Sequence, residues 1–243
     1  MNEILEQVIQ RRDTWRGYRD QFSSNTASAN SAAHATDGLP TGYDNLDAAL
    51  FQHGWPQGNT IELLSDIGTP AAMGLFLPAM EALSEQGRWQ AFIAPPYTPY
   101  APLLAARGID TRQILLIHPR SREDLLWSTE QALRSTTCST VFSWLGASEY
   151  RYSELRKLQL AATGSDALAI LFRPTQAAKN HAPATLRLQM LAHRKIHILK
   201  QRGGHQGIEV VLPPVEEIPE QSQLWALPAR TESGQQQSPA MGA

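Results

Sequence analysis

Short apolar runs alternate with helical patterns through the middle of the chain. Five of the runs lack the polar alternation of a half-exposed strand, which predicts strands buried on both faces at residues 60–64, 90–94, 114–118, 140–145 and 167–172. Apolar residues at helical spacing predict helices between them, over about 71–86, 99–107, 121–135 and 149–163. This order predicts an α/β fold with a mainly parallel sheet and helices on both faces.

The two ends of the chain differ from this middle part. Residues 187–200 and 207–212 flank Gly203-Gly204, which predicts a C-terminal β-hairpin at the sheet edge. The sequence therefore predicts four segments in the whole chain: an amphipathic arm at 1–21, a flexible linker of small polar residues at 22–38, a core domain at 39–213 and a loose tail at 214–243. The arm either packs on its own domain or docks on another protein.

Composition narrows the class of protein. Apolar residues make up 42% of the 243, which excludes a fully disordered chain. A formal charge of −2 excludes a globally basic coat for nucleic acid. The single cysteine, Cys138, excludes an internal disulfide framework and a cysteine-rich zinc site. No signal peptide or membrane span is visible, so we expect a soluble cytoplasmic protein.

The loop after the first predicted strand is the natural place for a phosphate-binding turn. It holds one glycine, no lysine and an acidic residue, and Pro70 removes one phosphate-facing N–H. We therefore predict a degenerate nucleotide site, with no bound cofactor, at Ser65, Asp66, Gly68, Thr69 and Ala71.

A family resemblance begins just before this loop. Residues 39–50 (Leu-Pro-Thr-Gly-Tyr-Asp-Asn-Leu-Asp-Ala-Ala-Leu), then Gly54-Trp55-Pro56-Gln57-Gly58 and Ile61-Glu62, resemble the entrance to the RecA recombinase ATPase core. The resemblance implies a RecA-like fold of the P-loop NTPase type. The family's P-loop lysine then falls at Ala71 or Ala72, its catalytic acidic residue at Pro96 and its magnesium-binding aspartate at Trp144. Losing all three groups predicts a protein that is not an enzyme, with an active ATPase kept as an alternative.

The second half of the core resembles another family. Gly87-Arg88-Trp89-Gln90, residues 131–135, Ser143-Trp144-Leu145 and Leu171-Phe172-Arg173-Pro174 look like the SulA group of SOS cell-division inhibitors. This resemblance implies an inhibitor that binds FtsZ.

The ImuA family combines both halves, and the chain is identified as a member of it. It is similar also at Thr14-Trp15-Arg16-Gly17 and at the proline-rich residues 94–102. The resemblance implies a non-catalytic accessory protein of the SOS response that supports error-prone translesion DNA synthesis. Its implied partners are ImuB, RecA and an error-prone replicative-type polymerase. The SulA-like inhibitor of FtsZ is the alternative.

Three residue pairs are candidates for binding a partner: Trp15 with Arg16, Arg88 with Trp89, and Lys200 with Arg202. The Arg88-Trp89 pair has the composition of an interface anchor, and core packing is the other interpretation. Residues 200–204 resemble a basic hairpin that some RecA-like assemblies direct at a neighbouring subunit. An ordinary basic turn and a weak contact with a nucleic-acid backbone stay open.

Other chemistry has little support. His193 and His197 are four residues apart, but strand geometry would separate them, so we expect no metal site. Cys138 is expected in a polar turn, and Trp127 is expected to pack on the sheet. No catalytic residue is predicted.

Overall fold

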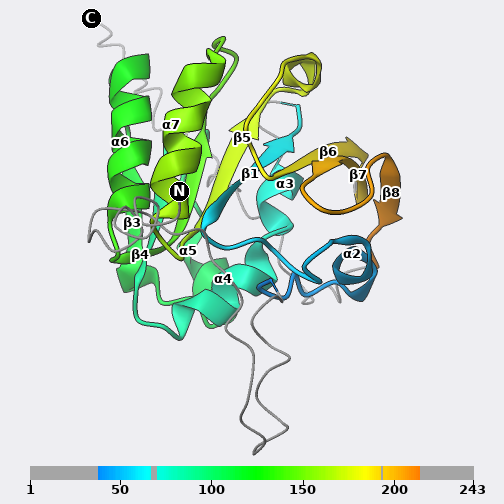
Figure 1. Cartoon of the computed structure of the whole chain (residues 1–243). Coiled ribbons are helices and arrows are strands. Elements are labelled where there is room, and N and C mark those ends of the chain that lie inside the picture. Colours follow the sequence, from blue (N-terminus) through cyan, green and yellow to red (C-terminus); the bar gives the residue numbers. More distant parts are fainter. Residues whose placement is uncertain (1–37, 67–69, 193, 214–243) are drawn as a thin grey trace, which may run out of the picture. The chain divides into compact units, whose positions relative to one another are not determined.

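The computed structural model describes residues 38–66, 70–192 and 194–213 (Figure 1). The predicted arm, the linker up to residue 37 and the tail lie outside the described residues. The strands are β1 (Asn59–Leu64), β2 (Trp89–Ile93), β3 (Ile114–Ile117), β4 (Cys138–Trp144), β5 (Leu168–Arg173), β6 (Leu186–Ala192), β7 (Lys195–Gln201) and β8 (Ile208–Val211). The α-helices are α2 (Asp44–Ala49), α3 (Pro70–Gly74), α4 (Leu77–Ser84), α5 (Ala101–Ala106), α6 (Arg122–Arg134) and α7 (Tyr152–Thr163), with 3-10 turns at Thr111–Gln113 and Thr175–Lys179.

The eight strands of the described residues belong to one sheet, in the order β3-β2-β4-β5-β1-β6-β7-β8. The pairs from β3 to β6 along this order are parallel, whereas β7 is antiparallel to both β6 and β8. Strand β1 lies between β5 and β6, so the strand that comes first in the chain is near the centre of the sheet.

Helices cover both faces of the parallel part of the sheet. Helices α6 and α7 lie side by side on one face, and α4 lies on the other (Figure 1). Each face has its own core. The α6–α7 side includes Ile93, Val141, Leu155 and Leu171. The other side is richer in aromatic rings, among them Trp55, Phe76, Phe92, Phe142 and Phe172.

The predicted fold class, a RecA-like sheet of the P-loop NTPase type, is wrong. The sheet is mixed, because residues 187–200 do not form one arm of a hairpin. They fold into β6 and β7, which turn back at Arg194 in the left-handed region (φ 70°). Alternate residues of these strands are buried, among them Leu186, Leu188, Ile196 and Ile198. That alternation is typical of antiparallel strands with one covered face, whereas the sequence pattern alone predicts a single hairpin arm over 187–200.

The five predicted strands are confirmed as β1 to β5, with ends shifted by one or two residues. The helices predicted at 99–107, 121–135 and 149–163 are confirmed as α5, α6 and α7. The helix predicted over 71–86 is divided into α3 and α4, and Pro78 stands in the first turn of α4. None of the described helices is long and apolar enough to cross a membrane.

The motif before β1 has a structural role. The Asp47 carboxylate accepts a hydrogen bond from the backbone N–H of Thr41 (3.0 Å), and the Thr41 hydroxyl accepts one from the Tyr43 N–H (3.1 Å). Leu39 forms an antiparallel bridge with Trp55, and the side chains of Leu46 and Trp55 are fully buried. These residues fix α2 and the chain's entry to β1, which explains their spacing without nucleotide chemistry.

Gly42 provides a test of this packing. Its φ is +83°, and a Cβ there would stand 2.4 Å from the Cβ of Pro78, the residue near the start of α4. We expect Gly42→Ala to lower the free energy of unfolding by about 3 kcal/mol, from backbone strain together with overpacking. Urea denaturation measures the change. Gly108→Ala is the control, because Gly108 has a similar φ of +76° but open space around it. An equal loss in both variants would contradict the close contact with Pro78.

Candidate partner-binding site

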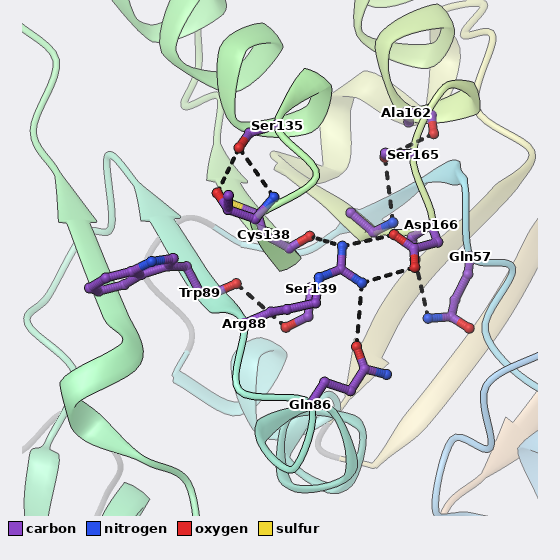
Figure 2. Close-up of polar contacts among 12 residues, drawn as sticks. Gln57, Gln86, Arg88, Trp89, Ser135, Cys138, Ser139, Ala162, Ser165 and Asp166 are labelled. Atoms are coloured by element: carbon purple, nitrogen blue, oxygen red, sulfur yellow. Dashed lines mark hydrogen bonds and ion pairs between the residues drawn. The ribbon is translucent and has the colours of Figure 1, made fainter.

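Arg88 ties together the amino ends of three strands. It precedes β2, and its guanidinium forms two hydrogen bonds with the Asp166 carboxylate, from Nη2 to Oδ1 (2.7 Å) and from Nη1 to Oδ2 (2.9 Å). Nη2 also donates to the backbone oxygen of Cys138 at the start of β4 (2.6 Å), as Figure 2 shows. Asp166 lies just before β5, so one side chain fixes the starts of β2, β4 and β5 relative to one another.

Neighbouring polar groups extend this cluster. Gln57 Nε2 donates to the backbone oxygen of Asp166 (3.2 Å), and Gln86 Oε1 accepts weakly from Arg88 Nη1 (3.4 Å). The Arg88 side chain is only 21% exposed. Its hydrogen bonds are made within the fold, so Arg88 positions the neighbouring strands and offers little of its side chain to a partner.

Trp89 points the other way. Its indole extends away from Arg88 and Asp166 (Figure 2) and is 43% exposed. The backbone at this position is held on both sides, because Trp89 N donates to Thr137 O (2.9 Å) and Ser139 Oγ donates to Trp89 O (3.4 Å). The pairing of β2 with β4 shifts register between Trp89 and Gln90. A fixed backbone carrying an exposed indole is the arrangement of an interface anchor.

The exposed apolar surface continues along the sheet edge. β3 is the last strand on this side, and its Leu115 and Leu116 are both exposed. Leu115 pairs with Ala91, two residues after Trp89, so Leu115 and Trp89 lie on the same face of the sheet. Leu116 pairs with Phe92 and points to the opposite face of the sheet, so we call Trp89 and Leu115 alone the β3-edge surface. Edge strands with exposed apolar residues are unusual on proteins that have no partner.

The ion pair of Arg88 with Asp166 has a defined pH dependence. Hydrogen bonds from Arg88 lower the pKa of Asp166, against a smaller rise caused by burial. Because the folded pKa lies below the unfolded one, the stabilisation is fully present above the unfolded pKa. It is lost as the pH falls through the folded pKa.

We expect Asp166→Asn to cost at most about 1 kcal/mol of unfolding free energy at neutral pH, because the Asp166 side chain is 73% exposed and solvent screens the pair. The difference from the unmodified protein should shrink below about pH 4, where unfolded aspartate takes up its proton. Urea titrations at pH 7 and pH 3 measure both values. Glu85→Gln, a charge loss at the exposed end of α4, is the control. A cost that grows on acidification would contradict the assignment.

The second described pair, Lys200 and Arg202, does not form a projecting finger. Lys200 Nζ donates to the backbone oxygen of Ala182 (3.0 Å), and burial together with the nearby Arg187 lowers the pKa of this lysine. Arg202 is exposed, and its backbone N–H donates to Thr185 O (3.0 Å). Lys200 therefore holds the backbone at Ala182 and is only partly exposed, whereas Arg202 is exposed. Trp15 and Arg16 lie outside the described residues.

The predicted degenerate loop is only partly visible. Ser65 is buried and Asp66 is exposed at the end of β1, Ala71 belongs to α3, and Gly68 and Thr69 lie outside the described residues. Trp144 stacks on Phe172 with ring centroids 4.5 Å apart, so it belongs to the packing between strands. No group of three metal-ligating residues occurs in the described part of the chain. His197 lies in β7, and His193 is outside the described residues.

Two smaller expectations are wrong. Cys138 is not in a polar turn, because it begins β4 and is buried, and burial raises the pKa of its thiol. Trp127 does not pack on the sheet, because it lies on the outer side of α6 and is 64% exposed.

Sequence reasoning missed a buried ionic cluster. Glu62 in β1 accepts from Arg173 Nη1 (3.1 Å) and from Arg187 Nε (2.7 Å), and all three side chains are more than nine-tenths buried. Arg187 Nη2 also donates to Ala177 O (2.8 Å), which holds the turn at Thr175–Lys179 against the sheet. The signal in the sequence is one charged residue in each of three mainly apolar strands.

Comparison with known proteins gives this architecture a family. The family model for the cell division inhibitor SulA matches residues 58–169, from the turn before β1 to the start of β5. The cell division inhibitor SulA of Escherichia coli O1:K1 / APEC is 30% identical over 123 residues, which are 51% of this chain and 69% of that protein. The chain belongs to the SulA family. This membership completes the correction of the RecA-like class, and the narrower ImuA prediction is not confirmed by these comparisons.

Other SulA proteins align over different shares of the chain. The SulA of Escherichia fergusonii is 27% identical over 182 residues, covering 74% of this chain and 95% of that protein. The crystal structure of SulA from Pseudomonas aeruginosa is 29% identical and covers 49% of this chain and 99% of that one, with a TM-score of 0.39. Arg88, Trp89 and β3 all lie within the stretch that the family model matches.

Proposed function

We propose that this protein is a SulA-like cell division inhibitor of the SOS response that acts by binding FtsZ. The observation that carries the proposal is membership of the SulA family, whose relatives are named as cell division inhibitors, one of them aligned over 95% of its length. The matched stretch also contains the exposed Trp89, so the family resemblance and the best candidate anchor coincide.

We also propose that inhibition is stoichiometric and needs no catalysis by this chain. Trp144 is engaged in ring stacking, and Pro96 cannot donate a backbone hydrogen bond. These residues give a bound phosphate neither a metal ligand nor a donor. The protein would then act by occupying a surface of its partner, through the β3-edge surface.

Purified FtsZ and GTP provide the test. We expect the protein to reduce FtsZ polymer, measured by light scattering and sedimentation, in proportion to its molar ratio, and to do so without nucleotide consumption of its own. A matched amount of heat-unfolded protein is the control. Unchanged polymerisation at a several-fold excess of the folded protein would overturn the proposal.

A translesion accessory role of the ImuA type is the second candidate. One observation favours it: the folded unit includes the segment from Gly38 to Gln57, which precedes the SulA match at residue 58 and carries the sequence features shared with ImuA. Pull-downs with ImuB, RecA and an error-prone polymerase separate the two roles. If the protein retains these partners and has no effect on FtsZ, the translesion role is favoured. Deletion of residues 1–38 would show whether RecA binding needs the N-terminal segment.

A further inference from the structure

A cavity of about 350 Å³ lies at the amino ends of β1 and β6, beside the last residue of the antiparallel β7. Its lining comes from segments far apart in the chain: residues 50–59 on one side, and residues 185–186 and 201–203 on the other. In the sheet, β4 and β5 lie between β1 and β2, the strand that carries Trp89. The cavity is therefore separate from the β3-edge surface, and the proposed binding of FtsZ does not account for it.

One buried side chain joins the two walls of this cavity. Gln201 is 6% exposed, and its Oε1 accepts from the backbone N–H of Phe51 (2.9 Å). Its Nε2 donates to the backbone oxygens of Ala49 (3.1 Å) and His205 (2.6 Å). Gly204 allows this arrangement, because a Cβ there would stand 2.5 Å from Gln201 Cδ. The shape of the cavity is thus set by the fold itself, as in most small-molecule sites.

Phe51 gives the cavity an aromatic wall. Its ring packs on Gly203, where a Cβ would stand 2.8 Å from the ring atom Cε1. Gly203 also has a φ of +87°, so both the turn and the contact with the ring need a glycine. Phe51 nevertheless stays 59% exposed. An aromatic ring that is held in place at a cavity, with much of its surface in water, favours a ligand whose flat apolar part covers it.

Arg202 supplies the charge. Among the described residues that line the cavity, it is the one with a charged side chain, and it is exposed. A hydrogen bond from its backbone N–H to Thr185 O (3.0 Å) fixes its place in the wall. Asn59 Oδ1 accepts from the Thr185 hydroxyl (2.8 Å), and Asn59 Nδ2 donates to Gln57 O (3.1 Å), so these side chains are engaged within the fold. A guanidinium binds a carboxylate through two parallel N–H···O bonds, so Arg202 favours a ligand that carries one.

We propose that this cavity binds a small aromatic acid, with a single or fused ring that lies against Phe51 and a carboxylate that pairs with Arg202. The volume is near the lower end of the range for ligand sites, which favours a free small molecule over a longer chain. The site does not depend on the surface proposed for FtsZ, so either assignment can fail without the other.

Three indole probes that differ in charge test the proposal on the full chain. In ¹H–¹⁵N spectra, we expect indole-3-acetate to shift the amides of Phe51, Arg202 and Gly203 saturably, with a Kd on the order of 1 mM for so small a ligand. Indole lacks the carboxylate and should bind about tenfold more weakly, and tryptamine, which carries a cation instead, should bind more weakly still. Shifts that do not saturate, that lie elsewhere in the molecule, or that show equal affinity for the three probes would overturn the proposal.

Two variants test the two halves of the site. Arg202→Gln should weaken indole-3-acetate about tenfold and leave indole unchanged, because only the acid uses the guanidinium. Arg156→Gln, which removes an exposed charge from α7, is the matched control and should leave both ligands unchanged. Phe51→Ala should weaken both ligands, because both use the ring.

Thermal melting checks the fold of each variant, and Arg202→Gln decides if Phe51→Ala does not fold. Equal weakening of indole-3-acetate by Arg202→Gln and Arg156→Gln would mean that the acid responds only to the overall charge of the protein, which would contradict the assigned site. Undiminished binding of both ligands to folded Phe51→Ala would contradict it as well.

Discussion

Replacing Glu62 by glutamine is expected to lower the free energy of unfolding by about 4 kcal/mol. The change keeps the side-chain volume, but it removes the only negative charge between the guanidinium groups of Arg173 and Arg187, among the ion pairs that the described residues form. Both groups are more than nine-tenths buried, so water cannot solvate them in place of the carboxylate. Removing one partner of such a cluster costs far more than the intact cluster contributes.

Urea denaturation followed by circular dichroism measures this loss. Glu209→Gln is the matched control, because Glu209 forms an equally short ion pair with Lys195 (2.7 Å) that is exposed to solvent. We expect the control to change stability by less than about 0.5 kcal/mol. Similar losses of stability in the two variants would show that the effect of Glu62→Gln does not come from burial of the ionic cluster.

Replacing Trp89 by alanine is expected to weaken binding to FtsZ by about 30-fold while the fold is kept. An exposed indole on a fixed backbone is the kind of side chain that carries a large share of interface energy, about 2 kcal/mol or more. Its removal costs little stability because the ring is 43% exposed. Biolayer interferometry gives the affinity, and thermal melting checks the fold.

Trp127→Ala is the control for this result. It removes an exposed indole of the same size from α6, on the side of the helix opposite its buried residues Leu125, Thr129 and Ala132. We expect its affinity to stay within about twofold of the unmodified protein. If the two variants lose affinity equally, or if Trp89→Ala binds normally while the unmodified protein does inhibit FtsZ, the anchor is misplaced but the function stands.

The sequence predicts the parallel part of the fold well, for a clear reason. Strands β1, β2, β4 and β5 are largely buried on both faces, and with β3 they appear as apolar runs that are short enough to be strands. The two strands within residues 187–200 are harder to predict, because the turn between them, with Arg194 in the left-handed region, contains no glycine or proline. The mixed sheet therefore could not be read from periodicity alone.

The segment before β1 misled the assignment of fold class. Thr41, Gly42 and Asp47 match a recombinase pattern in type and spacing, yet here Asp47 holds the backbone of Thr41 before α2, and Gly42 packs closely against Pro78 of α4. Residue patterns that serve packing survive where catalytic residues do not, so such a pattern indicates a backbone arrangement more reliably than a chemistry.

The candidate site was predicted in part. The Arg88-Trp89 pair was singled out by composition, but sequence could not show that Arg88 is bonded to Asp166, 78 residues away, or that only Trp89 is presented. The Glu62 cluster joins residues more than 100 positions apart, beyond the reach of any local pattern. Long-range polar pairing is the information that a single sequence lacks.

The position of β1 in the sheet constrains how the chain acquires its structure. β1 pairs with β5 and β6, so Ile61 can pair only after Ile170 on one side and Leu186 on the other have been synthesised. During synthesis, the apolar residues of β1 have neither neighbour until the chain has grown by more than a hundred residues. Folding should therefore be slow and late, and the nascent chain should depend on chaperones until β6 has left the ribosome.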